Sequence, residues 1–204
     1  MHISSDNKAV SLFSEIGELV LLNFLVILTS LPVFTAGAAL TSGYEILLRR
    51  DDPEERVVTT TFFRKFAANF RSVTPVWMLL LLGILLGGGD LIYALFIAEE
   101  LRMFFLCFSI AVLFVVISIG FWIFPLFASF ENKRTAHLEN AFRMTFLQFP
   151  RTIRMWAVWV VPAYFTLTYE TILKYFGWIW ILCGISGLMY LSAKTAAGAF
   201  ESRQ

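Results

Sequence analysis

Residues 73–98 read VTPVWMLLLLGILLGGGDLIYALFIA, and residues 103–130 read MFFLCFSIAVLFVVISIGFWIFPLFASF. Both runs are almost wholly apolar, and only the short charged stretch 99–102 separates them. A helix needs about 20 mostly apolar residues to cross the hydrocarbon core of a bilayer, so each run is long enough to do so. Together the two runs predict a membrane hairpin, and this hairpin decides the fold class.

Three further apolar segments lie outside the hairpin, at 18–48, 152–173 and 176–199. The composition agrees with burial in lipid, because 58% of residues are hydrophobic and 15% are charged, whereas soluble domains carry roughly 25% charged residues. We therefore expect an all-α polytopic transmembrane bundle of about five spans, forming a single membrane domain over residues 1–204. A re-entrant pair broken at Pro32 would instead give six membrane segments.

The basic residues separate the loops between the two sides of the membrane. Segment 49–72 carries six Lys and Arg residues and segment 131–154 carries five, whereas the connections at 99–102 and 170–174 carry one each. By the positive-inside rule the two basic segments are cytoplasmic. Five spans then place the C-terminus in the cytoplasm and the N-terminus outside, and the six-segment alternative reverses the N-terminus.

Two short amphipathic helices are predicted inside the basic segments, at 59–71 and 135–149. In each, aromatic or aliphatic side chains recur every three or four residues, which places them on one helix face. Such helices lie at the membrane interface or pack beneath the bundle. We predict a cytoplasmic interface or partner surface formed by Phe62, Phe66, Phe70, Leu138, Phe142, Phe146 and Phe149, together with Arg64 and Arg143.

The same helices indicate a parallel internal repeat. The sequence FRKFAANFRSVTPVW at 63–77 aligns without gaps on FRMTFLQFPRTIRMW at 142–156, with four identities. Parallel repeats of this kind occur in transporters. The repeat units span about residues 18–98 and 103–173, and a last span covers 176–199.

Polar side chains within the apolar segments are candidates for a ligand path, because an ionisable residue in the bilayer costs about 2.5–3.5 kcal/mol on insertion scales. Asp90 follows three glycines and precedes Tyr93 near the outer end of the second span, so it is either a proton or substrate site or an interfacial or helix-capping carboxylate. Asn23 either lines a path or hydrogen-bonds across helices. Pro32 either exposes backbone to a substrate or only breaks the helix. The candidate ligand-path residues are thus Asp90, Tyr93, Asn23 and Pro32.

The sequence gives little support for enzymatic or metal chemistry. His2 and His137 have no companions at ligand spacing, and the chain contains no P-loop, HExxH or GxSxG motif. We expect no catalytic residue, no metal ligand and no cofactor. Glu45, four residues before Arg49, is interpreted as ordinary helix support.

The order of several motifs resembles the YesL-like family of bacterial integral membrane proteins, which are classed as a domain of unknown function. The motifs are Asn23 in the first helix, the break at 30–32 followed by small residues at 36–39, the FFRKFAANF and AFRMTFLQFPRTI helices, and the DLIY sequence at 90–93. The resemblance covers about residues 10–200. It implies genes that often lie beside carbohydrate uptake and degradation systems, and it carries over no catalytic residues.

These observations support three functional hypotheses. The first is an accessory membrane component associated with carbohydrate uptake, which binds a transporter subunit or another membrane partner. The second is a small self-contained transporter or channel that works as an oligomer, and the third is an intramembrane enzyme. The expected partners are the lipid bilayer and a transporter subunit or a second copy of the chain. Nucleic acid is not expected, because basic residues near the inner leaflet attract anionic lipid.

Overall fold

A computed structural model of the chain describes residues 4–49 and 58–201, with side chains from residue 14 onward. Arg50 and Arg56 of the first basic segment, and His2, lie outside the described residues. The described elements are all helical, as expected. In chain order they are α1 (Ser4–Ser30), η1 (Val33–Thr35), α2 (Ala36–Leu48), α3 (Val58–Phe96), α4 (Arg102–Ser129), α5 (Arg134–Leu147), α6 (Phe149–Thr168), α7 (Glu170–Phe176), the π-helix η3 (Trp180–Gly184) and α8 (Ile185–Glu201).

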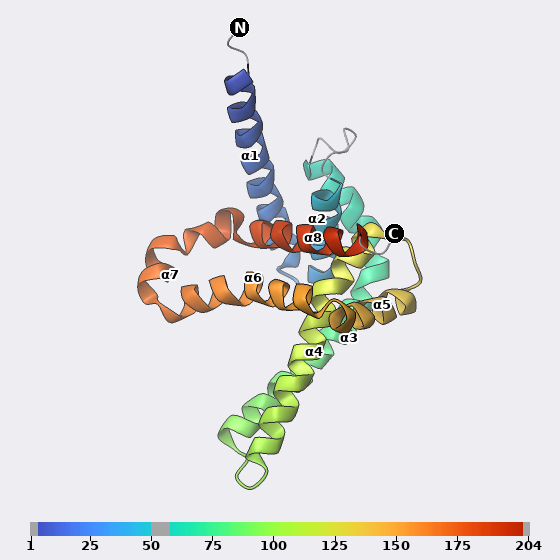
Figure 1. The fold of residues 1–204 in the computed structure, drawn as a ribbon, viewed down its shortest axis with the longest axis vertical. Helices are drawn as coiled ribbons and strands as arrows, with labels where there is room; N and C mark the ends of the chain where they lie inside the picture. The colour runs from blue at the N-terminus through green and yellow to red at the C-terminus, as the bar shows by residue number, and fades with distance from the viewer. Residues whose placement is uncertain (1–3, 50–57, 202–204) are drawn as a thin grey trace.

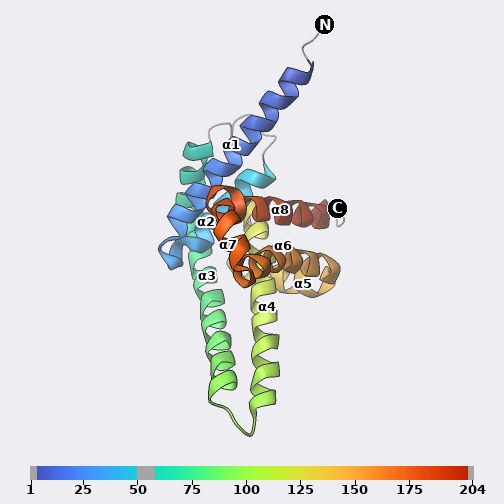
Figure 2. The ribbon, with the colours of Figure 1, turned by 90° about the vertical axis from the view of Figure 1, so that its left-hand side faces the viewer.

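The predicted hairpin is formed by α3 and α4, which run antiparallel and side by side (Figure 2). Both helices are long and apolar enough to cross a membrane. Gly83 and Gly87 of α3 face α4, where an added Cβ would lie 3.2 Å from a methyl of Val116 and 3.0 Å from a methyl of Leu113. Small residues four apart allow two membrane helices to approach closely.

The first predicted amphipathic helix is continuous with the second predicted span, so 59–71 and 73–96 form the single helix α3. Pro75 lies inside this helix and cannot donate to the carbonyl of Arg71, which normally ends or kinks a helix. Here the Arg134 guanidinium of α5 donates to the Arg71 carbonyl oxygen at 2.8 Å. A side chain distant in sequence therefore satisfies the carbonyl that the proline leaves free.

The helix break at Pro32 is confirmed. The Thr35 hydroxyl donates to the carbonyl oxygens of Thr29 and Pro32, and the Trp77 indole donates to the carbonyl oxygen of Val33 at 2.6 Å. Past the break the chain turns back, so the start of α1 and the end of α2 lie at the same end of the molecule (Figure 1). This arrangement favours the re-entrant pair over a single first span.

A second arm consists of α6, α7 and α8. In it α6 and α8 run side by side and α7 joins them at the far end (Figure 1). A bend of 70° separates α7 from the η3–α8 segment. The arm lies across the α3–α4 hairpin, so its helices do not extend the hairpin as parallel spans. Among the described residues two helices qualify as spans, or three if the bent pair counts as one, and the prediction of five spans is not confirmed.

One indole group links the second arm to the hairpin, and another links two helices within that arm. Trp122 of α4 is fully buried and donates to the Thr152 hydroxyl of α6 at 3.0 Å. Trp159 of α6 donates to the Ser192 hydroxyl of α8 at 3.0 Å. A buried indole N–H needs a partner, so each bond fixes the packing of one helix pair.

Candidate functional site

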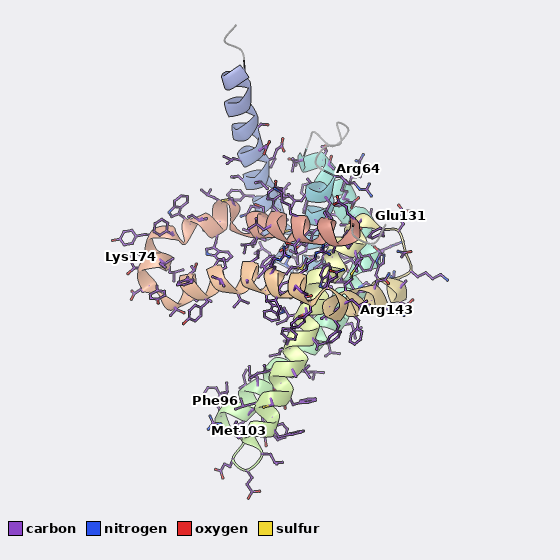
Figure 3. The ribbon with its side chains drawn as sticks, in the orientation of Figure 1. Arg64, Phe96, Met103, Glu131, Arg143 and Lys174 are labelled. Atoms are coloured by element: carbon purple, nitrogen blue, oxygen red, sulfur yellow. The ribbon has the colours of Figure 1, made fainter. Side chains whose placement is uncertain are left out.

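A polar depression at the base of the hairpin is the main concave polar site among the cavities of the described residues. It consists of two adjoining cavities of about 420 Å³ and 580 Å³, which share Asn69, Phe127, Phe130 and Glu131. We call it the basal recess. It lies at the end of α3 and α4 that carries Arg64 and Glu131, opposite the tip with Phe96 and Met103 (Figure 3).

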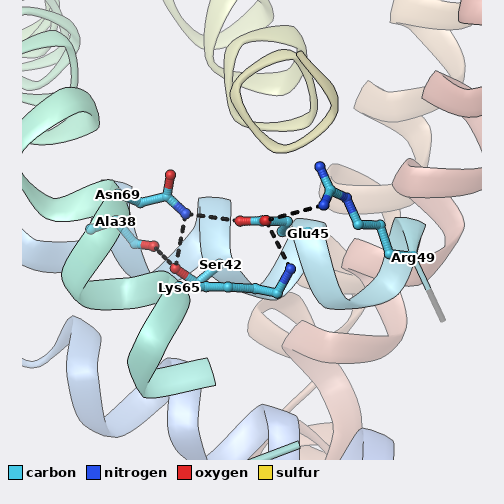
Figure 4. Close-up of polar contacts among 6 residues, drawn as sticks. All are labelled: Ala38, Ser42, Glu45, Arg49, Lys65 and Asn69. Atoms are coloured by element: carbon cyan, nitrogen blue, oxygen red, sulfur yellow. Dashed lines mark hydrogen bonds and ion pairs between the residues drawn. The ribbon is translucent and has the colours of Figure 1, made fainter. Parts of the chain in front are cut away.

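The inner wall of the recess is a hydrogen-bonded cluster between α2 and α3 (Figure 4). The ammonium of Lys65 contacts one Glu45 carboxylate oxygen at 2.8 Å, and the Asn69 amide donates to the other at 3.1 Å. Arg49 lies 4.0 Å from the same carboxylate. The i, i+4 pair expected from the sequence is present, but the closer cation is Lys65, whose side chain is 8% exposed.

Positive charge predominates around the recess. The described ionic side chains that line it are four basic ones, Arg49, Arg64, Lys65 and Lys133, and two acidic ones, Glu45 and Glu131. Four positive charges minus two negative charges leave a local formal charge of +2. A concave surface of one sign concentrates ions of the opposite sign, so the recess favours anions.

His137 closes the recess on the α5 side. It is 1% exposed, and its ring stacks on Phe127 with the ring centroids 4.0 Å apart. Its Nδ1 is buried and has no hydrogen-bond partner among the described residues. Burial lowers the pKa of His137 below its ordinary value, because the charged imidazolium loses hydration. Sequence analysis set His137 aside for lack of neighbouring ligands, since the residues around it come from other helices.

The four candidate ligand-path residues do not come together. Asp90 lies near the hairpin tip, where the Ser109 hydroxyl donates to its carboxylate at 2.8 Å. Tyr93 lies one turn further along α3 and contacts the edge of Phe105. Pro32 is exposed at the break between α1 and η1. The three glycines before Asp90 are helical, so Asp90 lies within α3 and caps no new turn.

Asn23 is fully buried and hydrogen-bonds across helices, which confirms the structural interpretation of this residue. Its amide nitrogen donates to the carbonyl oxygens of Trp180 at 3.0 Å and Ile181 at 2.7 Å, and its amide oxygen accepts from the Ser186 backbone N–H at 2.9 Å. Residues 181 and 186 are five apart, the spacing of a π-helical hydrogen bond. The Asn23 amide thus bridges backbone groups of η3 and of the first turn of α8.

The two phenylalanine rows predicted as one kind of surface differ in exposure. Phe62 is fully buried, and Phe66 and Phe70 are half-buried, so the row on α3 packs beneath the bundle and Phe62 is not a partner surface. On α5 the buried face consists of His137, Ala141, Met144 and Thr145, with Leu138 packed beside it. The opposite side of α5 carries Phe142, Arg143, Phe146 and, just beyond the helix, Phe149, all of them exposed.

The long apolar hairpin and the extensive exposed apolar surface define a helical membrane protein. Residues 19–91 match the family model described as "Protein of unknown function, DUF624". The matched part runs from α1 into α3, and the match agrees with the resemblance found in the motifs. No curated protein and no solved structure matches the chain.

Proposed function

We propose that the protein is a non-catalytic accessory membrane component that binds a transporter subunit or another membrane partner through its cytoplasmic end. The observation that supports this proposal is the exposed aromatic surface of α5, formed by Phe142, Phe146 and Phe149. The association with carbohydrate uptake comes from the family resemblance and is part of the proposal.

The α5 surface has the composition of a docking site. The Phe142 and Phe146 rings pack edge to face, with their centroids 5.1 Å apart. Both side chains are about half exposed, at 49% and 50%. Arg143 lies beside them on the same exposed side of the helix and pairs with Glu139. Aromatic and Arg side chains are enriched where proteins meet, because they bury a large area and still make polar contacts.

The charge distribution supports a cytoplasmic position for this end of the molecule. Basic side chains surround the base of α3 and α4, and the hairpin tip carries Glu99 and Glu100. The positive-inside rule then places the base in the cytoplasm and the tip outside. Because α1 starts at the same end as α2 finishes, the N-terminus of the described chain falls on the cytoplasmic side in this proposal.

Self-contained transport as an oligomer is the second candidate, and the geometry gives it less support. The amide of Asn23 is occupied by backbone groups of η3, and Asp90 is bonded to Ser109 at the hairpin tip. The cavity between α2, α3, α4 and α6 is lined by side chains such as Leu40, Leu80 and Phe121 and is almost entirely apolar. A polar solute would lose its hydration there without compensating hydrogen bonds.

The test is affinity purification of the tagged protein from its native membrane in mild detergent, followed by mass spectrometry. The Phe142→Ala/Phe146→Ala variant should lose a stoichiometric membrane partner that the unmodified protein retains. The matched control is Phe104→Ala/Phe108→Ala, which removes an exposed, stacked pair at the same four-residue spacing from α4. The control should retain the partner.

The same preparations distinguish the two candidates. If the purified chain, reconstituted alone into vesicles, takes up a solute and loses that uptake in an Asp90→Asn variant, the accessory role is wrong. Equal loss of the partner in both phenylalanine variants would also contradict it, because α5 would then have no special part in binding.

A further inference from the structure

We propose that the basal recess binds the phosphate group of an anionic ligand, held between the basic side chains of α3 and the start of α5. This inference is independent of the partner proposed above, because it concerns a small-molecule or headgroup site rather than the aromatic surface of α5.

The cations of the recess converge from separate elements. Arg64 and Lys65 come from α3, Arg49 follows α2, and Lys133 immediately precedes α5. Glu45 pairs with Lys65 and lies 4.0 Å from Arg49, and Glu131 lines both cavities. The two carboxylates offset two of the four positive charges and leave the net charge of +2 given above. A phosphate group accepts several charge-assisted hydrogen bonds and matches such a cluster better than a single carboxylate does.

The start of α5 adds backbone donors beside these cations. The first amides of any α-helix have no partner within the helix, and they attract anions. In α5 the N-cap residue Lys133 makes no side-chain capping bond, and the first turn contains no acidic residue. Lys133 itself lines the recess, so these donors lie at its edge.

His137 is the observation that points to a ligand rather than to a solvated basic surface. A buried polar atom without a hydrogen bond is costly, so it is rare unless something else provides its partner. His137 lines the recess, and its buried Nδ1 lacks such a partner among the described residues. An anion oxygen in the recess would accept a hydrogen bond from this nitrogen.

The volume of the recess suits a phosphorylated ligand. Sites for small molecules and cofactors usually enclose about 300–1,000 Å³, and the two adjoining cavities have volumes of about 420 Å³ and 580 Å³. The aromatic rings of Phe127 and Phe130 border both cavities and offer an apolar surface for the rest of the ligand. A soluble phosphate ester and an anionic lipid headgroup share this chemistry.

The test uses histidine NMR, because the chain has two histidines and a His2→Gln variant leaves His137 as the sole reporter. This variant is purified without a histidine tag and placed in phosphatidylcholine nanodiscs, where inorganic phosphate is the first probe. Nanodiscs containing phosphatidylglycerol, without phosphate, are the second probe. Binding should shift the His137 signal saturably and raise its pKa, because a nearby anion favours the imidazolium.

Substitutions then locate the effect. Lys133→Gln or Arg64→Gln should weaken the affinity for the probe, read from the His137 signal, about tenfold or more. This is the fold-change equivalent to one lost charge-assisted hydrogen bond. Arg143→Gln is the matched control, because it removes the same charge from the exposed side of α5, outside the recess. It should change the response less than about twofold, as expected for a solvent-screened charge.

Each outcome decides the proposal. A response to free phosphate supports a soluble phosphate ester, and a response to phosphatidylglycerol alone supports a lipid headgroup. If neither probe shifts the His137 signal, or if Arg143→Gln weakens it as much as Lys133→Gln does, the recess is not an anion site.

Discussion

Replacing Asn23 with Leu should destabilise the protein more than any other single loss of a polar side chain in α1. The substitution preserves side-chain size but removes three hydrogen bonds to the backbone of Trp180, Ile181 and Ser186. Side-chain hydrogen bonds in membrane proteins contribute about 0.6 kcal/mol each on average, and a buried N–H left unpaired costs about 1–3 kcal/mol. Two lost bonds and one orphaned Ser186 N–H together give about 2–4 kcal/mol.

Two measurements report this loss. The first is thermal unfolding in detergent with tryptophan fluorescence as the readout, and the second is hydrogen exchange at residues 180–186. For a chain of this size, each kcal/mol corresponds to roughly 2–4 °C in Tm, so Asn23→Leu should lower Tm by about 4–16 °C. Asn140→Leu on the exposed side of α5 is the control and should change Tm little. If Asn23→Leu unfolds at the unmodified temperature and the exchange of η3 is unchanged, Asn23 does not brace the π-helix.

Three further predictions follow from the packing and charges. Gly37→Ala should cost about 1–3 kcal/mol of stability through overpacking, because the added Cβ would lie 2.5 Å from the Cβ of Trp77, which the backbone holds in place. Gly88→Ala is the control: an added Cβ there meets open space, so its Tm in the same assay should not fall. Glu45→Gln should cost about 2–4 kcal/mol by leaving the Lys65 ammonium without its nearest carboxylate, and adding Lys65→Met should restore most of the lost Tm. Burial lowers the pKa of His137 in the folded protein, so at falling pH the unfolded chain takes up a proton on this residue before the folded protein does. The free energy of unfolding should therefore decrease as pH drops from about 6.5 through the folded-state pKa. That pH dependence should be absent in a His137→Phe variant measured over the same range.

The sequence predicted the features that depend on local composition. The α3–α4 hairpin follows from two long apolar runs, and the break at Pro32 follows from a proline that cannot continue a helix. The separate helix α5 also has a local cause, since Pro150 stands at the second position of α6 and Gln148 leaves the helical conformation before it. In the aligned sequence at 63–77, Arg71 occupies the position of Pro150, and the helix there continues into the long apolar part of α3.

Features that depend on contacts between distant residues were not predictable in this way. The continuation of α3 past Pro75 depends on Arg134, and the main partner of Glu45 is Lys65 rather than its helical neighbour Arg49. Hydropathy also does not predict that the second arm crosses the hairpin, because it gives the length of an apolar helix but not the orientation of that helix relative to its neighbours. For the same reason the basal recess, which collects side chains from α2, α3, α4 and α5, had no counterpart in the sequence patterns.

Three of the backbone interruptions among the described residues share one physical solution, and it changes how nearby polar residues should be interpreted. Thr35 satisfies carbonyls at the Pro32 break, Arg134 satisfies the carbonyl freed by Pro75, and Asn23 bridges the backbone of η3. A buried backbone group without a hydrogen bond is costly, so a side-chain donor or acceptor stabilises each of these three breaks. A polar residue beside an irregular helix is therefore first explained by that break. Asn23 and the break at Pro32 have such an explanation, whereas the buried Nδ1 of His137, which has no hydrogen-bond partner among the described residues, has none.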